Sequence, residues 1–228
     1  MSERVDNCAV HLFSRALSPT MITPEQALPG RSERPFELPA THAVLGTPLE
    51  CPNDFPDDLE KVYLAMGCFW GAERRLWRLP GVYTTAVGYQ GGFTPNPTYP
   101  EVCTGRTGHA ESVLVVYDPK QVAFIDILRV FWENHDPTQG YRQGNDVGTQ
   151  YRSAVYWTTP AQEELARETA RQYQAVLTGH GLDPITTELA SAEGRDFYYA
   201  EPEHQQYLHK HPHGYDCHAN TGYALPAL

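Results

Sequence analysis

The stretch Met66-Gly67-Cys68-Phe69-Trp70-Gly71 decides how this sequence folds, and the rest of the chain is organised around it. Residues 61–65 before it favour a strand, and residues 72–77 after it favour a helix that ends at Pro80. Cys68 is therefore predicted where a strand turns into a helix. Because the free N–H groups at a helix N-terminus stabilise negative charge, we expect a lowered thiol pKa and a reactive sulfur.

Two glycines and two aromatic residues beside Cys68 favour a small binding site. Gly67 and Gly71 allow a tight turn and a close approach of the backbone, and Phe69 and Trp70 place apolar faces next to the sulfur. The alternative is an ordinary buried cysteine, because free cysteines are among the most buried residues in proteins. The position of Cys68 alone leaves these two interpretations evenly balanced.

Length and composition limit the classes of protein to which this chain can belong. Its 228 residues, 41% of them apolar, suit one domain of ordinary size or a domain with a long extension. A formal net charge of −11 without a basic block argues against nucleic acids and anionic membrane surfaces as partners. We expect no signal peptide and no membrane span. Five cysteines without a metal-ligand spacing fit the reducing cytoplasm.

Residues 1–60 contain eight prolines, which exclude long helices and central strands there. We expect an extended lead, packed over the domain or partly disordered, with one short helix at about 23–28. Cys8 and Cys51 lie in this lead, and no catalytic role is expected for either.

From residue 61 onward, the hydrophobic pattern alternates between strands and helices, with irregular loops at about 90–99 and 136–151. This mixture indicates a two-layer α+β sandwich, although the pattern alone does not separate it from a small doubly wound fold. The expected strands cover about 61–67, 82–89, 111–117, 153–157 and 185–190, and the expected helices about 69–79, 124–134, 160–177 and 202–208.

Six segments of the sequence, taken in order, resemble the type A peptide methionine sulfoxide reductases. The first is the Gly-Cys-Phe-Trp-Gly run at 67–71, which follows its strand. The resemblance spans roughly residues 61–218 and is far more specific than any one pentapeptide. The other segments are 108–111 (Gly-His-Ala-Glu), 134–137 (Asn-His-Asp-Pro), 143–146 (Gln-Gly-Asn-Asp), 148–153 (Gly-Thr-Gln-Tyr-Arg-Ser) and 204–208 (His-Gln-Gln-Tyr-Leu).

The resemblance implies a mixed sheet of the ferredoxin-like plait kind, with added elements and long irregular termini. A catalytic α+β domain at 61–208 is then expected between the Pro-rich lead 1–60 and a mobile, irregular tail 209–228. The tail contains Cys217, which matches the recycling cysteine of the family. Because no cysteine follows Cys217, we expect no relay through a second tail cysteine.

The same resemblance implies roles for five residues. Cys68 is the nucleophile, and Glu111 is the acid, because a carboxyl group in a partly apolar site has a raised pKa and can donate a proton near pH 7. From the pattern alone, Glu111 is the exposed end of a strand. Tyr99 and Tyr151 correspond to the tyrosines that bind the substrate oxygen, and Asp146 to a residue that orients substrate or a water. By default they are two packing tyrosines and a turn aspartate.

The function that the resemblance implies is thiol-dependent reduction of methionine S-sulfoxide, free or within proteins, which repairs oxidative damage. Phe69 and Trp70 would hold the substrate methyl group while Cys68 becomes a sulfenic acid. Cys217 would convert this acid to a Cys68–Cys217 disulfide, which thioredoxin reduces. We expect no cofactor and no metal, and we expect a monomer.

Two other functions stay open from the residues alone. A cysteine hydrolase would use Cys68 with His109 or His135 as its base, although structural hydrogen bonds are the expected role of both histidines. A redox sensor or zinc-binding module would use Cys217 with the late histidines, but their spacing fits none of the usual ligand patterns. Cys103 is expected to be structural. The late histidines are His204, His209, His211, His213 and His218.

Overall fold

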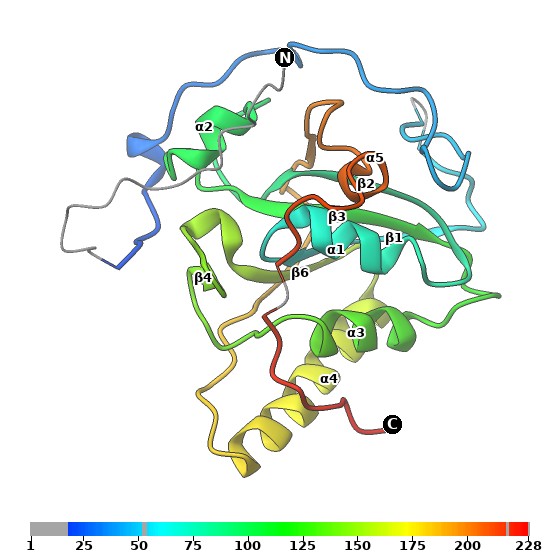
Figure 1. Ribbon diagram of the computed structural model, residues 1–228, viewed down its shortest axis with the longest axis vertical. Helices are drawn as coiled ribbons and strands as arrows, with labels where there is room; N and C mark the ends of the chain where they lie inside the picture. The colour runs from blue at the N-terminus through cyan, green and yellow to red at the C-terminus, as the bar shows by residue number, and fades with distance from the viewer. Residues whose placement is uncertain (1–17, 52–53, 218, 228) are drawn as a thin grey trace.

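A mixed sheet of six strands forms the centre of the structure, a computed structural model that describes residues 18–51, 54–217 and 219–227 (Figure 1). The strands are β1 (Glu60–Met66), β2 (Val82–Gln90), β3 (Ala110–Tyr117), β6 (Ser153–Trp157), β7 (Glu188–Ser191) and β8 (Tyr198–Tyr199). Their order is β7-β6-β1-β3-β2-β8, and only β6 and β7 run parallel.

The four strands β6-β1-β3-β2 have the order and the antiparallel pairing of a ferredoxin-like plait. β7 and β8 are added at the two edges. A doubly wound fold requires mostly parallel strands, so that alternative is wrong and the predicted α+β class is confirmed.

Side chains of the central strands alternate between the two faces of the sheet, as the pleat requires. On β1, Val62 and Leu64 belong to the main core, which they share with the helices. Tyr63 and Ala65 pack on the opposite face in smaller apolar clusters. Both faces of the sheet are therefore buried, which explains why the central strands are apolar almost throughout.

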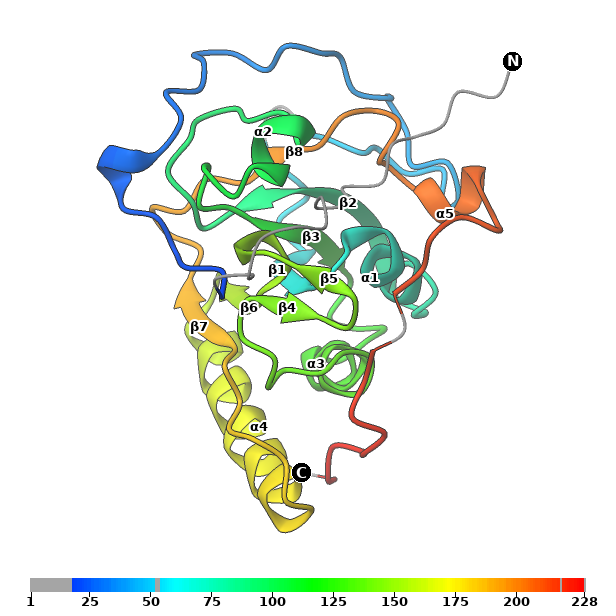
Figure 2. The same cartoon turned by 60° about the vertical axis from the view of Figure 1, so that its left-hand side comes forward.

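Helices cover one of these faces. They are α1 (Phe69–Leu76), α3 (Phe124–Glu133) and α4 (Pro160–Gly179), with two short helices, α2 (Tyr99–Cys103) and α5 (Tyr207–Lys210), near the site. Figure 2 shows α3 and α4 on the side of the molecule away from the lead. Among the described residues, none of the helices has the length and apolar character that a membrane crossing needs.

The structure adds α2 and β8, which were not expected, and it departs from the expected elements in two further segments. The loop expected at 136–151 contains a small hairpin of β4 (Arg142–Gln143) and β5 (Asp146–Val147), followed by the 3-10 helix Thr149–Tyr151. The helix expected at 202–208 is wrong, because Gln206 has a left-handed backbone with φ 48°, and α5 begins only after it. A right-handed helix cannot continue through such a residue.

The described part of the lead packs over the domain, as one of the two expectations proposed (Figures 1 and 2). It contains only the 3-10 turn Pro24–Gln26 where a short helix was expected. Leu49 is fully buried in the cluster that includes Leu114 and Val116 of β3, so the lead covers the sheet face that the helices leave open. Cys8 lies outside the described residues.

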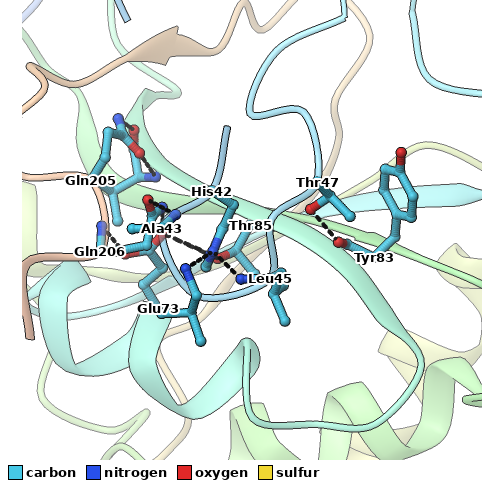
Figure 3. Close-up of polar contacts among 11 residues, drawn as sticks. His42, Ala43, Leu45, Thr47, Glu73, Tyr83, Thr85, Gln205 and Gln206 are labelled. Atoms are coloured by element: carbon cyan, nitrogen blue, oxygen red, sulfur yellow. Dashed lines mark hydrogen bonds and ion pairs between the residues drawn. The ribbon is translucent and has the colours of Figure 1, made fainter. Parts of the chain in front are cut away.

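His42 fixes the lead to the domain through a chain of buried hydrogen bonds (Figure 3). The amides of Val44 and Leu45 both donate to Nδ1 of His42, at 3.1 Å each, so the ring proton is on Nε2. Nε2 lies 2.9 Å from Oγ1 of Thr85 on β2, and this hydroxyl donates to Oε1 of Glu73 on α1, at 3.0 Å. The lead is thus joined to the sheet and to the helix that begins at the Cys68 stretch.

We expect His42→Ala to lower the free energy of unfolding by at least about 2 kcal/mol, because the buried hydroxyl of Thr85 and the part-buried amides of Val44 and Leu45 lose their hydrogen-bond partner. Burial also lowers the pKa of His42 from 6.5 to about 4. The unfolded chain therefore takes up the proton first on acidification, and the stability that neutral His42 contributes above pH 6.5 is lost as the pH falls towards 4. Urea unfolding of both proteins between these pH values measures the two effects.

Val44→Ala is the matched control for this experiment, because Val44 belongs to the same loop and its side chain is 41% exposed. It should unfold close to the unmodified protein at every pH. Equal unfolding midpoints for His42→Ala and Val44→Ala would show that the lead is not held by this histidine.

Candidate active site

Cys68 lies at the N-cap of α1, directly after β1 and Gly67, as the sequence predicts. Its side chain is 7% exposed and belongs to the main core. Gly67 has φ 85°, and a Cβ built on it would lie 2.6 Å from Cβ of Gln143 in β4. The turn before Cys68 therefore requires glycine for both its conformation and its close contact with the hairpin.

The expectation of a lowered pKa for Cys68 is wrong. Burial raises the pKa of this thiol well above its usual range, and the charge of Glu111 raises it further. Hydrogen bonds from the amides of Trp70 and Gly71, at the start of the helix, act in the opposite direction but do not prevail. The helix end thus stabilises the thiolate as expected, but desolvation and a neighbouring carboxylate outweigh it.

Glu111 is the second residue of β3, and its side chain is 1% exposed. The alternative of an exposed strand end is therefore wrong. Its Oε2 accepts a hydrogen bond from the amide of Phe69, at 3.0 Å. Burial raises the pKa of Glu111 to about 8, the Phe69 hydrogen bond opposes this rise, and the charge of Asp146 adds to it. At pH 7 this carboxyl group holds a proton that it can donate.

Phe69 and Trp70 form one wall of an aromatic cluster, together with Tyr99 and His204. The ring of Phe69 stacks 6.4 Å from that of Tyr99, and the ring of Trp70 stacks 5.7 Å from that of His204. His204 also lies 4.3 Å from Tyr99, between ring centroids. Nε1 of Trp70 donates to Nδ1 of His204 at 3.2 Å, so the proton of this imidazole is on Nε2. The sequence patterns place His204 in a family segment and among the candidate metal ligands, but they do not predict this packing role.

A buried carboxylate on α1 holds the segment that carries His204 (Figure 3). The amide and the side chain of Gln206 donate to the two oxygens of Glu73, at 2.9 and 2.8 Å. The amide of Ala43 in the lead donates to Oε1 of Gln206 at 3.2 Å. Gln205 bonds both backbone groups of Val87 on β2. These contacts stabilise the left-handed backbone of Gln206, and only the 204–208 segment of the family pattern could have indicated them.

The two tyrosines expected at the site lie close to Glu111. Tyr99 begins α2, and Tyr151 ends the 3-10 helix with 7% of its surface exposed. Burial raises the pKa of both hydroxyls, and the charge of Glu111 is the next largest cause in each case. Both phenols therefore stay protonated and able to donate. Cys103, expected to be structural, is half-buried at the end of α2 and raises the pKa of the same two groups.

Asp146 lies in β5 with its two oxygens in different situations. Oδ1 accepts a hydrogen bond from the hydroxyl of Tyr215 at 3.0 Å, whereas Oδ2 is buried and has no hydrogen-bond partner among the described residues. Burial raises the pKa of Asp146, and the side chains of Tyr215 and Cys217 oppose the rise. Oδ2 is therefore available to a donor on a substrate or a water.

The tail is irregular, as expected, but it is bound to the domain rather than free. Sγ of Cys217 lies 3.6 Å from the carbonyl oxygen of Gln143, and the thiol is partly exposed. Further along, the hydroxyl of Tyr173 on α4 contacts Thr221 at 2.6 Å, and Leu225 is 2% exposed. The structure thus brings the tail cysteine to the hairpin that packs against Gly67.

The alternative sites find little support in the contacts. His109 is held by the carbonyl oxygen of Thr94 at 2.7 Å and the amide of Gly92 at 3.0 Å. His135 is held by the carbonyl oxygen of Phe131 and the hydroxyl of Ser153. Their predicted structural roles are confirmed, because both nitrogens of each ring are bonded to groups other than Cys68. No metal-binding group of three His, Cys, Asp or Glu side chains gathers in the described part of the chain, which leaves out His218.

Comparisons with known proteins agree with this geometry. The family described as "Peptide methionine sulfoxide reductase" matches residues 60–226. A relative named "Peptide methionine sulfoxide reductase MsrA" from Rhodospirillum centenum is 59% identical, over 90% of this chain and 91% of the relative. A relative of the same name from Streptomyces griseus is 54% identical, over 94% of this chain and 96% of the relative.

Among solved structures, methionine sulfoxide reductase A of Corynebacterium diphtheriae is 49% identical with a TM-score of 0.80, over 92% of this chain and all of that one. Mxr1 from Saccharomyces cerevisiae in its reduced form is 32% identical with a TM-score of 0.63, over 76% of this chain and 95% of Mxr1. Family, sequence and structure lead to one conclusion. This chain belongs to the peptide methionine sulfoxide reductase family and is an oxidoreductase that reduces methionine sulfoxide.

Proposed function

We propose that this enzyme reduces the S epimer of methionine sulfoxide, free or within proteins, through a sulfenic acid on Cys68. One observation carries the proposal. A carboxyl group with a pKa of about 8, Glu111, is buried against the first turn of the helix that Cys68 begins. A proton donor and a sulfur nucleophile therefore lie together beside an aromatic cluster, and sulfoxide reduction needs these three features.

Substrate binding uses the apolar wall and the hydroxyl donors. Phe69 and Trp70 contact the S-methyl group, since both rings are buried in the same apolar cluster as Cys68. The hydroxyls of Tyr99 and Tyr151 donate hydrogen bonds to the sulfoxide oxygen and draw electrons from its sulfur. Asp146, whose Oδ2 has no hydrogen-bond partner in the described part of the chain, orients the substrate or a water.

The chemical step moves one oxygen atom from the substrate to the enzyme. The sulfur of Cys68 attacks the sulfoxide sulfur as a thiolate, while Glu111 donates its proton to the oxygen. Methionine leaves as the thioether, and Cys68 holds the oxygen as a sulfenic acid. Because ionised Glu111 raises the thiol pKa, the protonated form of Glu111 favours both the proton transfer and the thiolate.

The enzyme is then recycled by thiol exchange. Cys217 forms a disulfide with Cys68, and a dithiol protein of the thioredoxin type reduces it by two electrons. Cys217 is partly exposed, which supports access by such a partner. No further redox group is required, and repair of oxidised methionine is the outcome.

We also propose that the chain works as a cytoplasmic monomer without a cofactor, with the lead 1–60, the catalytic domain 61–208 and the tail 209–228 as its three segments. The four described cysteines are free thiols, which suits a reducing compartment. The lead also supports the site, because the amide of Ala43 donates a hydrogen bond to the side chain of Gln206.

Cys68→Ser should abolish reduction of methionine S-sulfoxide, because a hydroxyl is a far weaker nucleophile than a thiolate near pH 7. Chromatographic assay of methionine with dithiothreitol as reductant measures this. Cys51→Ser in the lead is the control and should keep full turnover. Undiminished turnover by Cys68→Ser would remove the basis of the proposal.

Glu111→Gln should slow sulfenic acid formation by a factor of about 10²–10⁴, because the amide cannot donate a proton as an acid does. In the unmodified enzyme, the rate of this step should fall as the pH rises through about 8, where Glu111 loses its proton. The variant should lack this fall. Single-turnover kinetics from pH 6 to 9 test both points, and alkylation of Cys68 checks that the thiol is intact. A variant with the original rate and pH profile would exclude Glu111 as the acid.

Cys217→Ser should leave the first turnover intact, since the chemistry at Cys68 precedes resolution. With thioredoxin as the only reductant, the variant should then stall as the sulfenic acid. Dithiothreitol should restore turnover, because a small thiol attacks the sulfenic acid directly. Steady-state rates with each reductant distinguish these cases. An unchanged rate with thioredoxin would assign resolution to another thiol.

A further inference from the structure

Three consecutive residues of the tail are each bound to a different part of the site. The hydroxyl of Tyr215 donates to Asp146 of β5, at 3.0 Å. Asp216 pairs with two arginines of α1. Sγ of Cys217 lies 3.6 Å from the carbonyl oxygen of Gln143 in β4. The tail is therefore fixed over the start of α1 while all described cysteines are reduced.

The ion pairs of Asp216 are the strongest of these attachments. Its side chain is only 7% exposed, and its two oxygens contact the guanidinium groups of Arg74 and Arg75 separately. Nη1 of Arg75 is 3.1 Å from Oδ1 of Asp216, and it also donates to the carbonyl oxygen of Gly71 at 2.9 Å. Charge-assisted hydrogen bonds away from water are the strong ones, so this pairing can hold a short peptide segment in place.

The backbone of α1 is shaped to receive this carboxylate. A Cβ built on Gly71 would lie 2.4 Å from Oδ1 of Asp216 and 3.0 Å from Nη1 of Arg75. Any side chain at position 71 would push the tail away from the helix. The second glycine of the Gly-Cys-Phe-Trp-Gly run thus leaves room for the aspartate that precedes Cys217.

Arg75 also lies near both sulfurs. Burial lowers the pKa of Arg75, whereas the charges of Cys217 and Cys68 act in the opposite direction. The guanidinium group that pairs with Asp216 is therefore within electrostatic range of both thiols.

We propose that Asp216 is a positioning residue for the resolving step, and that its pairing with Arg74 and Arg75 holds Cys217 beside Cys68 before Cys68 is oxidised. This inference rests on the proposed recycling by Cys217. In that step, Sγ of Cys217 attacks Sγ of the Cys68 sulfenic acid, and the S–O bond breaks. The hydroxyl group leaves with the thiol proton as water, so Cys217 is oxidised and the Cys68 sulfur is reduced to the disulfide level.

The consequence is a resolving thiol that is presented in advance rather than found by a freely moving tail. A preorganised intramolecular group reacts at a high effective concentration, and a misplacement of about 1 Å can cost about 10²-fold in rate. Removing the Asp216 charge should therefore slow disulfide formation while the first step, which uses Cys68 and Glu111, keeps its rate.

The test compares two variants with matched controls. Asp216→Asn and Arg74→Ala remove one charge each from the pairing. Asp196→Asn and Arg78→Ala remove the same charges from exposed positions. Each protein is mixed with methionine S-sulfoxide without reductant. Quenched samples are analysed for methionine, for the Cys68–Cys217 disulfide, and for Cys68 sulfenic acid trapped by dimedone.

We expect both variants to release the first methionine at the rate of the unmodified enzyme. Their disulfide should form at least about tenfold more slowly, with dimedone-trapped sulfenic acid accumulating in its place. The two controls should behave like the unmodified enzyme. Asp216→Glu should recover part of the rate, because it restores the charge at a changed distance.

Disulfide formation at the original rate in Asp216→Asn would overturn the inference. Equal slowing of methionine release and disulfide formation would also overturn it, since that indicates a general structural role. Cys217→Ser separates this failure from failure of the proposed function. If Cys217→Ser accumulates sulfenic acid and Asp216→Asn does not, only the role of Asp216 is wrong. If neither accumulates it, Cys217 is not the resolving residue.

Discussion

The hydrogen bond from the amide of Phe69 to the buried carboxyl of Glu111 joins the first turn of α1 to the central strand β3. The proposed mechanism depends on this contact, because it places a protonated carboxyl group against the helix turn that Cys68 begins. The pKa values of Glu111 and Cys68 also depend on each other. Burial keeps Glu111 protonated near pH 7, and a negative charge on Glu111 would raise the pKa of the Cys68 thiol. The proposed acid and the proposed nucleophile are therefore coupled through one charge, and the protonated carboxyl is the form that suits both roles.

Space around Cys68 is limited by two segments that approach from far along the chain. The β4–β5 hairpin packs against Gly67, and the tail packs against Gly71, each so closely that a Cβ would come within 2.6 Å of the other segment. The two glycines that flank Cys68 and its aromatic neighbours are thus required by tertiary contacts as well as by the turn. A thiol enclosed in this way is desolvated, which explains the raised pKa of Cys68.

The buried carboxylate of Glu73 has a corresponding role on the opposite side of α1. It accepts hydrogen bonds from Thr85 and Gln206, and through them it connects His42 of the lead with the segment that carries His204. Residues from both ends of the chain therefore hold the aromatic side chains around Trp70 in place. This arrangement gives the Pro-rich lead a physical reason to pack over the domain.

The sequence by itself determined the strand, turn and helix around Cys68 and the helix at 124–133, and the resemblance carried by its motif segments pointed to Cys68 and Glu111 as the proposed site residues. These depend on short-range periodicity, helix-start signals and ordered motif segments, which a sequence carries directly. The tertiary structure alone decided the direction of the Cys68 pKa shift, the packing of His204 against Trp70 and the attachment of the tail. Desolvation depends on everything that surrounds a group, and the pairing of Arg74 with Asp216 joins residues 142 positions apart, so neither is encoded in any local pattern.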